Sequence, residues 1–401
     1  MTTIHQRIDN IVAEIEPGLV ADRRHLHQHP ELAFQEYETA EFVRQRLESL
    51  GVENIRTGVG QTGVTGVIRG TASGVGGNVL LRADMDALPI LEETPVEFAS
   101  VNPGVMHACG HDAHTAILLS VARVLTDLRD QFAGTVTLCF QPAEELPPGG
   151  GIGMIQDGAL EGVDAVFALH MAAQMPTGTV AIAPGGVMAG GDLFRIIFQG
   201  KGGHAAEPHE SVDPVIAAAA TIVELQSVVS RNIDPMDRAV LSVCTFNGGE
   251  AFNVIPDTVE IGGTFRYFQF ETGERIEKRL TEIATDCASG LGCEAKVEIL
   301  RGYPPTVNDD AMAELARQAL IAELGEEAVR TADPVMGGED FSHMLRARPG
   351  AYYVVGCYSE VDGVNYGHHH PKFDVDEDSL AIGVRSMTSI ALAWLHENTK
   401  G

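Results

Sequence analysis

The chain has 401 residues, of which 44% are hydrophobic and 21% are charged, and glycine and proline are spread along its length. This length favours two domains, and the composition excludes a long disordered or repetitive segment. The 56 acidic residues outnumber the 27 basic ones, which gives a formal net charge of −29. Proteins that bind nucleic acid or anionic membranes are usually basic, so this charge argues against both kinds of partner.

The sequence carries no targeting or disulfide signal. Residues 1–19 lack the basic and apolar regions of a secretory signal, and no apolar run is long enough to span a bilayer. We therefore expect a cytoplasmic protein. No CxxC spacing occurs, which argues against a disulfide framework or a structural zinc knuckle. The cysteines are Cys109, Cys139, Cys244, Cys287, Cys293 and Cys357.

The first part of the chain predicts an α/β domain. Helical periodicity covers residues 4–27 and 36–50. Short β-rich runs follow, separated by helical or glycine-rich stretches that include a helix from about Thr115 to Leu128. These runs are GVTGVI, NVLLRAD, TVTLCFQ and AVFALH. Their apolar character is typical of strands in a sheet that is covered on both faces.

A second module follows the glycine-rich residues 182–191. The predicted order there is β-α-β-β-α-β, which is the ferredoxin-like split unit. The α/β pattern then resumes with a helix at residues 309–323, a strand AYYVVG and a final helix from about Ser379 to His396. We therefore predict an α/β domain of residues 1–185 and 303–401, an inserted domain of residues 186–302, and a ligand site in a cleft between the domains.

Ionisable residues end three of the apolar runs. Asp84 and Asp86 end NVLLRADMD, Glu144 and Glu145 end TVTLCFQPAEE, and His170 ends AVFALH. Ligands of open α/β sheets bind beyond the carboxyl ends of the strands. We therefore expect these side chains to face one common space.

The segment MHACGHDAH adds further donors at the start of a predicted helix. His107, Cys109 and His111 alternate, so in extended backbone they can face the same way. Thiolate, imidazole and carboxylate groups from distant segments are typical of a zinc site, with manganese, cobalt or nickel as alternatives. More donors are present than one tetrahedral ion needs, which indicates two ions.

Two other interpretations remain open from the residues alone. Cys109 can be a nucleophile with His107 or His111 as its base. The chain can also be a binding protein without catalytic activity. The adjacent Glu144 and Glu145 favour hydrolysis, because a carboxylate that binds no metal can act as a base.

Eight segments together resemble the metal-dependent amidohydrolase family of hippurate hydrolases, N-acyl-amino-acid aminoacylases and auxin-conjugate hydrolases. The segments are RRHLHQHPELAFQE, LRADMDALPI, MHACGHDAHTA, QPAEE, GKGGHAAEPH, NVIPD, MGGEDFS and HHHPKFDVDE. The resemblance implies a zinc-peptidase-like catalytic domain that binds two metal ions and carries an inserted ferredoxin-like lid. It also implies a homodimer or homotetramer, with contacts through the lid.

The resemblance further implies a metal-ligand set, which consists of Cys109, His111, Glu145, His170 and His369. Register against Pro371 selects His369 over His368 and His370. Glu144 is the implied general base, and Asp86 is the implied carboxylate that orients the ligands.

The lid is expected to supply the remaining functional residues. His204 is expected to stabilise the oxyanion, and the resemblance implies that it acts from the partner subunit. Asn253 and Arg266 are expected to bind the carboxylate of the substrate. Glu339 and Asp340 are expected to shape the pocket wall, without an assigned role.

The expected reaction is hydrolysis of the amide bond of an N-acyl or N-aroyl amino acid, which releases a carboxylic acid and the amino acid. The alternatives are a dipeptidase or carboxypeptidase with the same two-metal site and, less favoured, a hydrolase that depends on Cys109.

Overall fold

The computed structural model describes residues 3–360 and 363–399, which divide into two compact units. Unit 1 contains the described residues of 1–187, 307–333 and 340–401, and unit 2 contains residues 188–306 and 334–339. The division near residue 187 lies close to the predicted domain boundary. Residues 303–306 and 334–339 pack with unit 2, whereas the sequence had placed them with the first domain.

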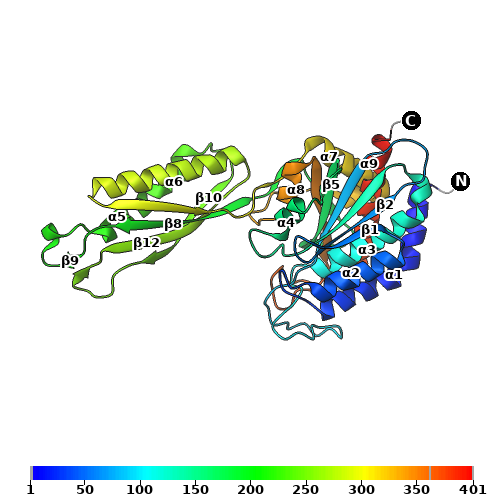
Figure 1. The fold of residues 1–401 in the computed structure, drawn as a ribbon, viewed down its shortest axis with the longest axis horizontal. Helices are drawn as coiled ribbons and strands as arrows, with labels where there is room; N and C mark the ends of the chain where they lie inside the picture. The colour runs from blue at the N-terminus through cyan, green and yellow to red at the C-terminus, as the bar shows by residue number, and fades with distance from the viewer. Residues whose placement is uncertain (1–2, 361–362, 400–401) are drawn as a thin grey trace. The chain divides into compact units, whose positions relative to one another are not determined.

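Unit 1 is built on a mixed sheet that carries β1, β2 and β5 (Figure 1). The sheet has eight strands in the order β1-β2-β4-β3-β5-β16-β6-β15. The strands are β1 (Glu53–Val59), β2 (Gly63–Arg69), β3 (Asn78–Asp84), β4 (Thr135–Gln141), β5 (Ala165–Pro176), β6 (Val180–Ile182), β15 (Val329–Thr331) and β16 (Gly350–Tyr358). Strands β4, β3, β5 and β16 are parallel neighbours, so their carboxyl ends meet at one edge of the sheet. β3 and β4 are buried along almost their whole length, as expected for a sheet with both faces covered.

Helices pack against this sheet. They are α1 (Ile4–Gln28), α2 (Tyr37–Ser49), α3 (His111–Asp127), α4 (Gly150–Gln156), α7 (Asp310–Leu324), α8 (Ser342–Ala347) and α9 (Asp378–Glu397). α3 and α9 contact the central strands β3 and β5, and α1 packs on both helices. The short strands β7 (Gly185–Met188) and β14 (Thr306–Asn308), where the chain passes between the units, pair with each other. The prediction missed the short elements β1, β6, β15, α4 and α8.

The start of α3 corrects one prediction. The helix begins at His111 instead of near Thr115. Gly110 precedes it with a φ of 95°, a left-handed conformation that glycine adopts without strain. Asp112 lies in the first helical turn, where a carboxylate interacts favourably with the helix dipole. His111 is therefore fixed by a helix instead of by extended backbone.

Unit 2 confirms the predicted β-α-β-β-α-β order. Its elements are β8 (Gly190–Gln199), α5 (Pro214–Ser227), β10 (Ala239–Asn247), β12 (Thr258–Tyr267), α6 (Phe270–Gly290) and β13 (Glu294–Leu300). The four strands form an antiparallel sheet in the order β10-β12-β8-β13. Alternate residues of β8, namely Phe194, Ile196 and Phe198, belong to a buried core that includes residues of α5 and α6. A separate two-stranded ribbon, β9 (Gly203–His204) with β11 (Val254–Ile255), was not predicted.

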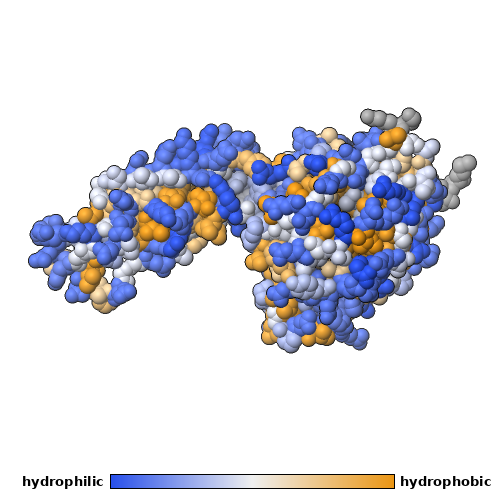
Figure 2. All heavy atoms as spheres, viewed as in Figure 1, coloured by the Kyte–Doolittle hydropathy of each residue, from blue (hydrophilic) through white to orange (hydrophobic). Residues whose placement is uncertain are grey.

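The visible face of each unit carries many hydrophilic residues, interspersed with hydrophobic areas (Figure 2). Among the described helices, none is long and apolar enough to cross a membrane.

Candidate metal centre

The predicted convergence at the strand ends is present in unit 1. β4, β3 and β5 are adjacent, which brings the segments with Asp84, Glu144 and His170 to neighbouring positions of the sheet. One detail differs from the prediction, because β5 continues to Pro176 and His170 lies within it. Pairing with β3 ends at Ala168 of β5, so His170 lies just beyond the end of the neighbouring strand.

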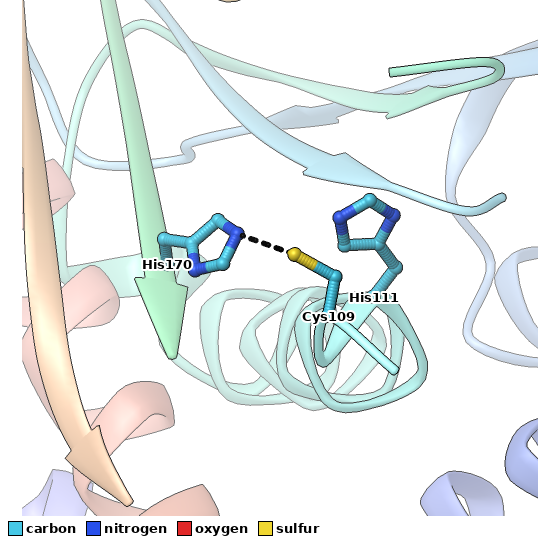
Figure 3. Close-up of side chains that lie close together, drawn as sticks. All are labelled: Cys109, His111 and His170. Carbon is cyan, nitrogen blue, oxygen red and sulfur yellow. Dashed lines mark hydrogen bonds between the residues drawn. The ribbon is translucent and has the colours of Figure 1, made fainter. Parts of the chain in front are cut away.

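Cys109, His111 and His170 form the first group of donors. The Cys109 Sγ lies 3.5 Å from the His170 Nε2, and His111 starts the adjacent helix α3 (Figure 3). The ligand atoms of all three residues lie within 4.8 Å of one another. The Nδ1 of His170 donates to the carbonyl oxygen of Met171 at 2.7 Å, so its Nε2 is the atom directed at Cys109.

Asp86 holds three parts of this region together. Its carboxylate oxygens accept hydrogen bonds from the backbone N–H groups of Glu144 at 2.9 Å and Glu145 at 3.0 Å. Its carbonyl oxygen accepts from the Nδ1 of His111 at 2.9 Å, which leaves the His111 Nε2 as the available ligand atom. Asp86 therefore contacts the backbone of both glutamates and the imidazole of His111.

A strained turn precedes the two glutamates. Ala143 has a φ of 52°, which is uncommon for a residue with a side chain. Its N–H donates to the buried carboxylate of Glu36 at 2.9 Å, and Thr62 donates to the other oxygen of Glu36. A specific hydrogen-bond partner thus offsets the strain of this turn. No local sequence pattern identifies Glu36 as a partner of this turn.

The loop of residues 368–370 supplies one histidine to the site. The His369 Nε2 lies 3.2 Å from the Oε1 of Glu145, and the His369 N–H donates to the carbonyl oxygen of Ala108 at 2.7 Å. His368 instead accepts from the N–H of Ala173 at 3.3 Å, and His370 stacks on Tyr366. The geometry therefore supports the selection of His369.

Three overlapping groups unite every predicted ligand. The ligand atoms lie within 4.8 Å of one another in each of the groups Cys109–His111–His170, Cys109–Glu145–His369 and His111–Glu144–Glu145. The His111 Nε2 is buried and accepts or donates no hydrogen bond among the described residues. A buried polar atom of this kind is costly, and coordination of a cation would satisfy it. The donors thus fit divalent ions.

The electrostatics of Cys109 favour the same interpretation. Burial raises the pKa of its thiol well above the usual value, and the nearby Glu145 and Glu144 add to this effect, although His111 opposes it. A nucleophilic cysteine normally has a lowered pKa in an electropositive environment. A cation beside Sγ would add positive charge to that of His111 and oppose the effects of burial and of the two glutamates. The site therefore fits a metal thiolate better than a cysteine nucleophile.

Unit 2 separates the predicted lid residues into two places. His204 and Asn253 are exposed and lie together in the β9–β11 ribbon, where the Ala205 N–H donates to the Asn253 carbonyl oxygen at 3.1 Å. Arg266 lies near the far end of β12, paired with Gly191. It is eight residues beyond Thr258, which corresponds to about 27 Å along a strand. Arg266 and Asn253 of one chain therefore do not contact the same carboxylate.

Donors from four segments at one edge of an α/β sheet, with a glutamate beside them, define a metal-dependent hydrolase. The model of peptidase family M20/M25/M40 matches residues 80–393, and the chain belongs to this family. It is a metal-dependent amidohydrolase, as the sequence motifs predicted.

Two curated relatives and one solved structure illustrate the family. IAA-amino acid hydrolase ILR1-like 4 of Arabidopsis thaliana is 42% identical over 94% of this chain and 86% of its own length. Thermostable carboxypeptidase 1 of Saccharolobus solfataricus is 39% identical over 97% of this chain and 98% of its own length. The YXEP protein of Bacillus subtilis, a dinuclear metal binding peptidase from the M20 family, is 35% identical with a TM-score of 0.84, covering 96% of this chain and 99% of the other.

Proposed function

We propose that the protein hydrolyses the amide bond of N-acyl or N-aroyl amino acids and releases a carboxylic acid and a free amino acid. The convergence of five candidate metal ligands beside Glu144 is the observation that carries this proposal. The substrates that the names of the two relatives indicate have one chemical feature in common. An IAA-amino acid conjugate and a carboxypeptidase substrate both end in an amino acid with a free carboxylate.

The metal site would be formed by five residues of unit 1. The overlapping groups around Cys109 and Glu145 support two ions per chain, for which we propose zinc, with manganese, cobalt or nickel as alternatives. When bound there, the ions would polarise the amide carbonyl and lower the pKa of a water molecule. The ligands proposed are Cys109, His111, Glu145, His170 and His369.

Glu144 is the proposed general base. It is buried, and its ligand oxygen lies within 4.8 Å of those of His111 and Glu145. Its backbone is held by the carboxylate of Asp86, which fixes the direction of the side chain. Glu144 would accept the proton of the attacking water and then donate it to the leaving amine, so one carboxylate acts as base and then as acid.

The separation of the lid residues supports a role for a second subunit. His204 and Asn253 lie at the ribbon that precedes Thr258, the first residue of β12, whereas Arg266 lies about 27 Å along that strand from Thr258. If all three act on one substrate, they must come from two chains. We therefore propose a homodimer in which Arg266 of one chain binds the substrate carboxylate, while His204 and Asn253 of the partner subunit contact the amide oxygen.

The proposal is tested by amine release from a substrate panel, with the bound metal counted. N-acetyl, N-benzoyl and N-indoleacetyl amino acids should be cleaved, and their counterparts that lack the carboxylate should be much poorer substrates. A preference for dipeptides would favour the peptidase alternative, and no release from any N-acyl amino acid would refute the proposal. Arg266→Met should raise KM for the N-acyl amino acids but not for the counterparts that lack the carboxylate. Arg195→Met, on the neighbouring strand β8, should leave both KM values unchanged.

A further inference from the structure

Asp340 is buried at the point where the chain returns to unit 1. Its Oδ1 accepts hydrogen bonds from Arg82 Nη2 at 2.9 Å and from Gln141 Nε2 at 2.6 Å. Its Oδ2 accepts from the N–H of Gly151 at 2.9 Å. All three side chains are buried, since the exposed fraction is 0% for Asp340, 1% for Arg82 and 0% for Gln141. Asp340 is therefore buried, and its ligand oxygen also lies within 4.8 Å of those of Glu339 and Glu144.

Arg82 connects Asp340 to Asp84 and then to His114. The Arg82 Nη1 donates to the Oδ2 of Asp84 at 2.6 Å, and the Oδ1 of Asp84 accepts from the His114 Nδ1 at 2.6 Å. The His114 Nε2 in turn accepts from the backbone N–H of Met171 at 2.9 Å. Both ring nitrogens of His114 are thus engaged, which excludes His114 as a metal ligand in this arrangement.

The chain of contacts ends at two of the proposed metal ligands. Met171 follows His170, and its carbonyl oxygen accepts from the His170 Nδ1 at 2.7 Å. The Oδ2 of Asp84 also lies 3.6 Å from the His111 Nε2. The rings of His114 and His170 are in edge contact, with centroids 4.5 Å apart. A shift of Asp340 would therefore move the backbone and side chains that direct His170 and His111.

We propose that Asp340, Arg82, Asp84 and His114 form a positioning relay for the metal ligands His170 and His111. This inference rests on the metal site of the proposed function. Burial of two carboxylates and a guanidinium is costly, and apolar side chains of the same volume often give equal or greater stability. The relay is therefore poorly explained by stability alone, whereas partners of this kind commonly control ligand orientation and metal affinity.

The glycine-rich turn before α4 packs directly on the relay. Gly149 has a φ of 85°, and a Cβ added there would lie 2.3 Å from the Oδ2 of Asp340. Only glycine fits this position without displacing Asp340. Gly149→Ala therefore perturbs the relay while every polar group of the relay is kept.

The relay is tested by titrating the metal-free chain with Co²⁺ in the absence of substrate. Asp340→Asn should weaken Co²⁺ binding roughly 10- to 100-fold and change the visible absorption spectrum of the bound ion. Gly149→Ala should shift both properties in the same direction. The matched control is Asp192→Asn in unit 2, because Asp192 is equally buried and accepts from Tyr267 at 3.0 Å and Arg301 at 3.1 Å. This control should unfold more easily but bind Co²⁺ like the wild type.

The outcomes separate the relay from the proposed function. The relay would be overturned if Asp340→Asn and the wild type had equal Co²⁺ affinity and equal spectra. It would also be overturned if Asp192→Asn weakened Co²⁺ binding as much as Asp340→Asn does. If Asp340→Asn does not fold, His114→Gln provides the test at the other end, and unchanged Co²⁺ binding there overturns the relay. If the wild type binds Co²⁺ but cleaves no N-acyl amino acid, the proposed substrate is refuted. The relay is still tested in that case, by the Co²⁺ affinity of each variant relative to that of the wild type. A wild type that binds no Co²⁺ refutes both.

Discussion

Replacement of Asp86 by asparagine tests how the catalytic segment is held. The Asp86 carboxylate accepts the N–H groups of Glu144 at 2.9 Å and Glu145 at 3.0 Å in a buried environment. The asparagine oxygen can accept one of them, but its NH₂ group then faces the other donor. A buried N–H without a partner costs about 1–3 kcal/mol. If this cost falls on the transition state, kcat/KM should fall roughly 5- to 150-fold.

The assay measures kcat/KM for an N-acyl amino acid, together with metal content and urea unfolding. Asp309→Asn is the matched control, because Asp309 also accepts two backbone N–H groups, those of Ala311 and Met312 at 3.0 Å, but at an exposed helix start. Asparagine is as good as aspartate at that position, so activity and stability should stay near wild type. Wild-type kcat/KM and metal content in Asp86→Asn would show that Asp86 does not orient the glutamates.

Three further substitutions test individual roles. Glu144→Gln should lower kcat roughly 10²- to 10⁴-fold with metal content unchanged, and substantial remaining turnover would exclude Glu144 as the general base. Arg23→Met should reduce the free energy of unfolding, measured in urea, by about 3–5 kcal/mol. Arg23 is fully buried, and its Nε lies 2.9 Å from the Oδ2 of Asp112, so the substitution leaves a buried carboxylate without this partner. A loss below about 1 kcal/mol would contradict this prediction. His369→Ala should lower the bound metal per chain whereas His370→Ala should not, and the reverse result would reassign the ligand.

The sequence predicted the features that follow from local pattern. The apolar runs before Asp84 and Glu144 are buried neighbouring strands, so the expected edge of the sheet gathers the candidate ligands. The split β-α-β-β-α-β order of unit 2 also follows from periodicity alone. Short elements such as α4 and α8 were missed, since a helix of six or seven residues shows little periodicity.

Features that depend on distant contacts were not predictable in the same way. The left-handed Ala143 exists because Glu36, more than a hundred residues earlier, accepts its N–H. Arg82 was visible as a charge inside an apolar strand, which could have indicated a buried partner, but nothing local identifies Asp340 as that partner. Arg266 and Asn253 were assigned to one carboxylate because sequence position carries no information on their separation along the sheet.

The most direct test of the central claim is amine release before and after metal removal. The chain is treated with a chelator, the residual metal is counted, and the rate of hydrolysis of one N-acyl amino acid is followed as Zn²⁺ or Mn²⁺ is added back. A two-metal site predicts that activity disappears with the metal and returns as occupancy approaches two ions per chain. Full activity in the metal-free chain, abolished instead by alkylation of Cys109, would contradict the account and establish a cysteine hydrolase.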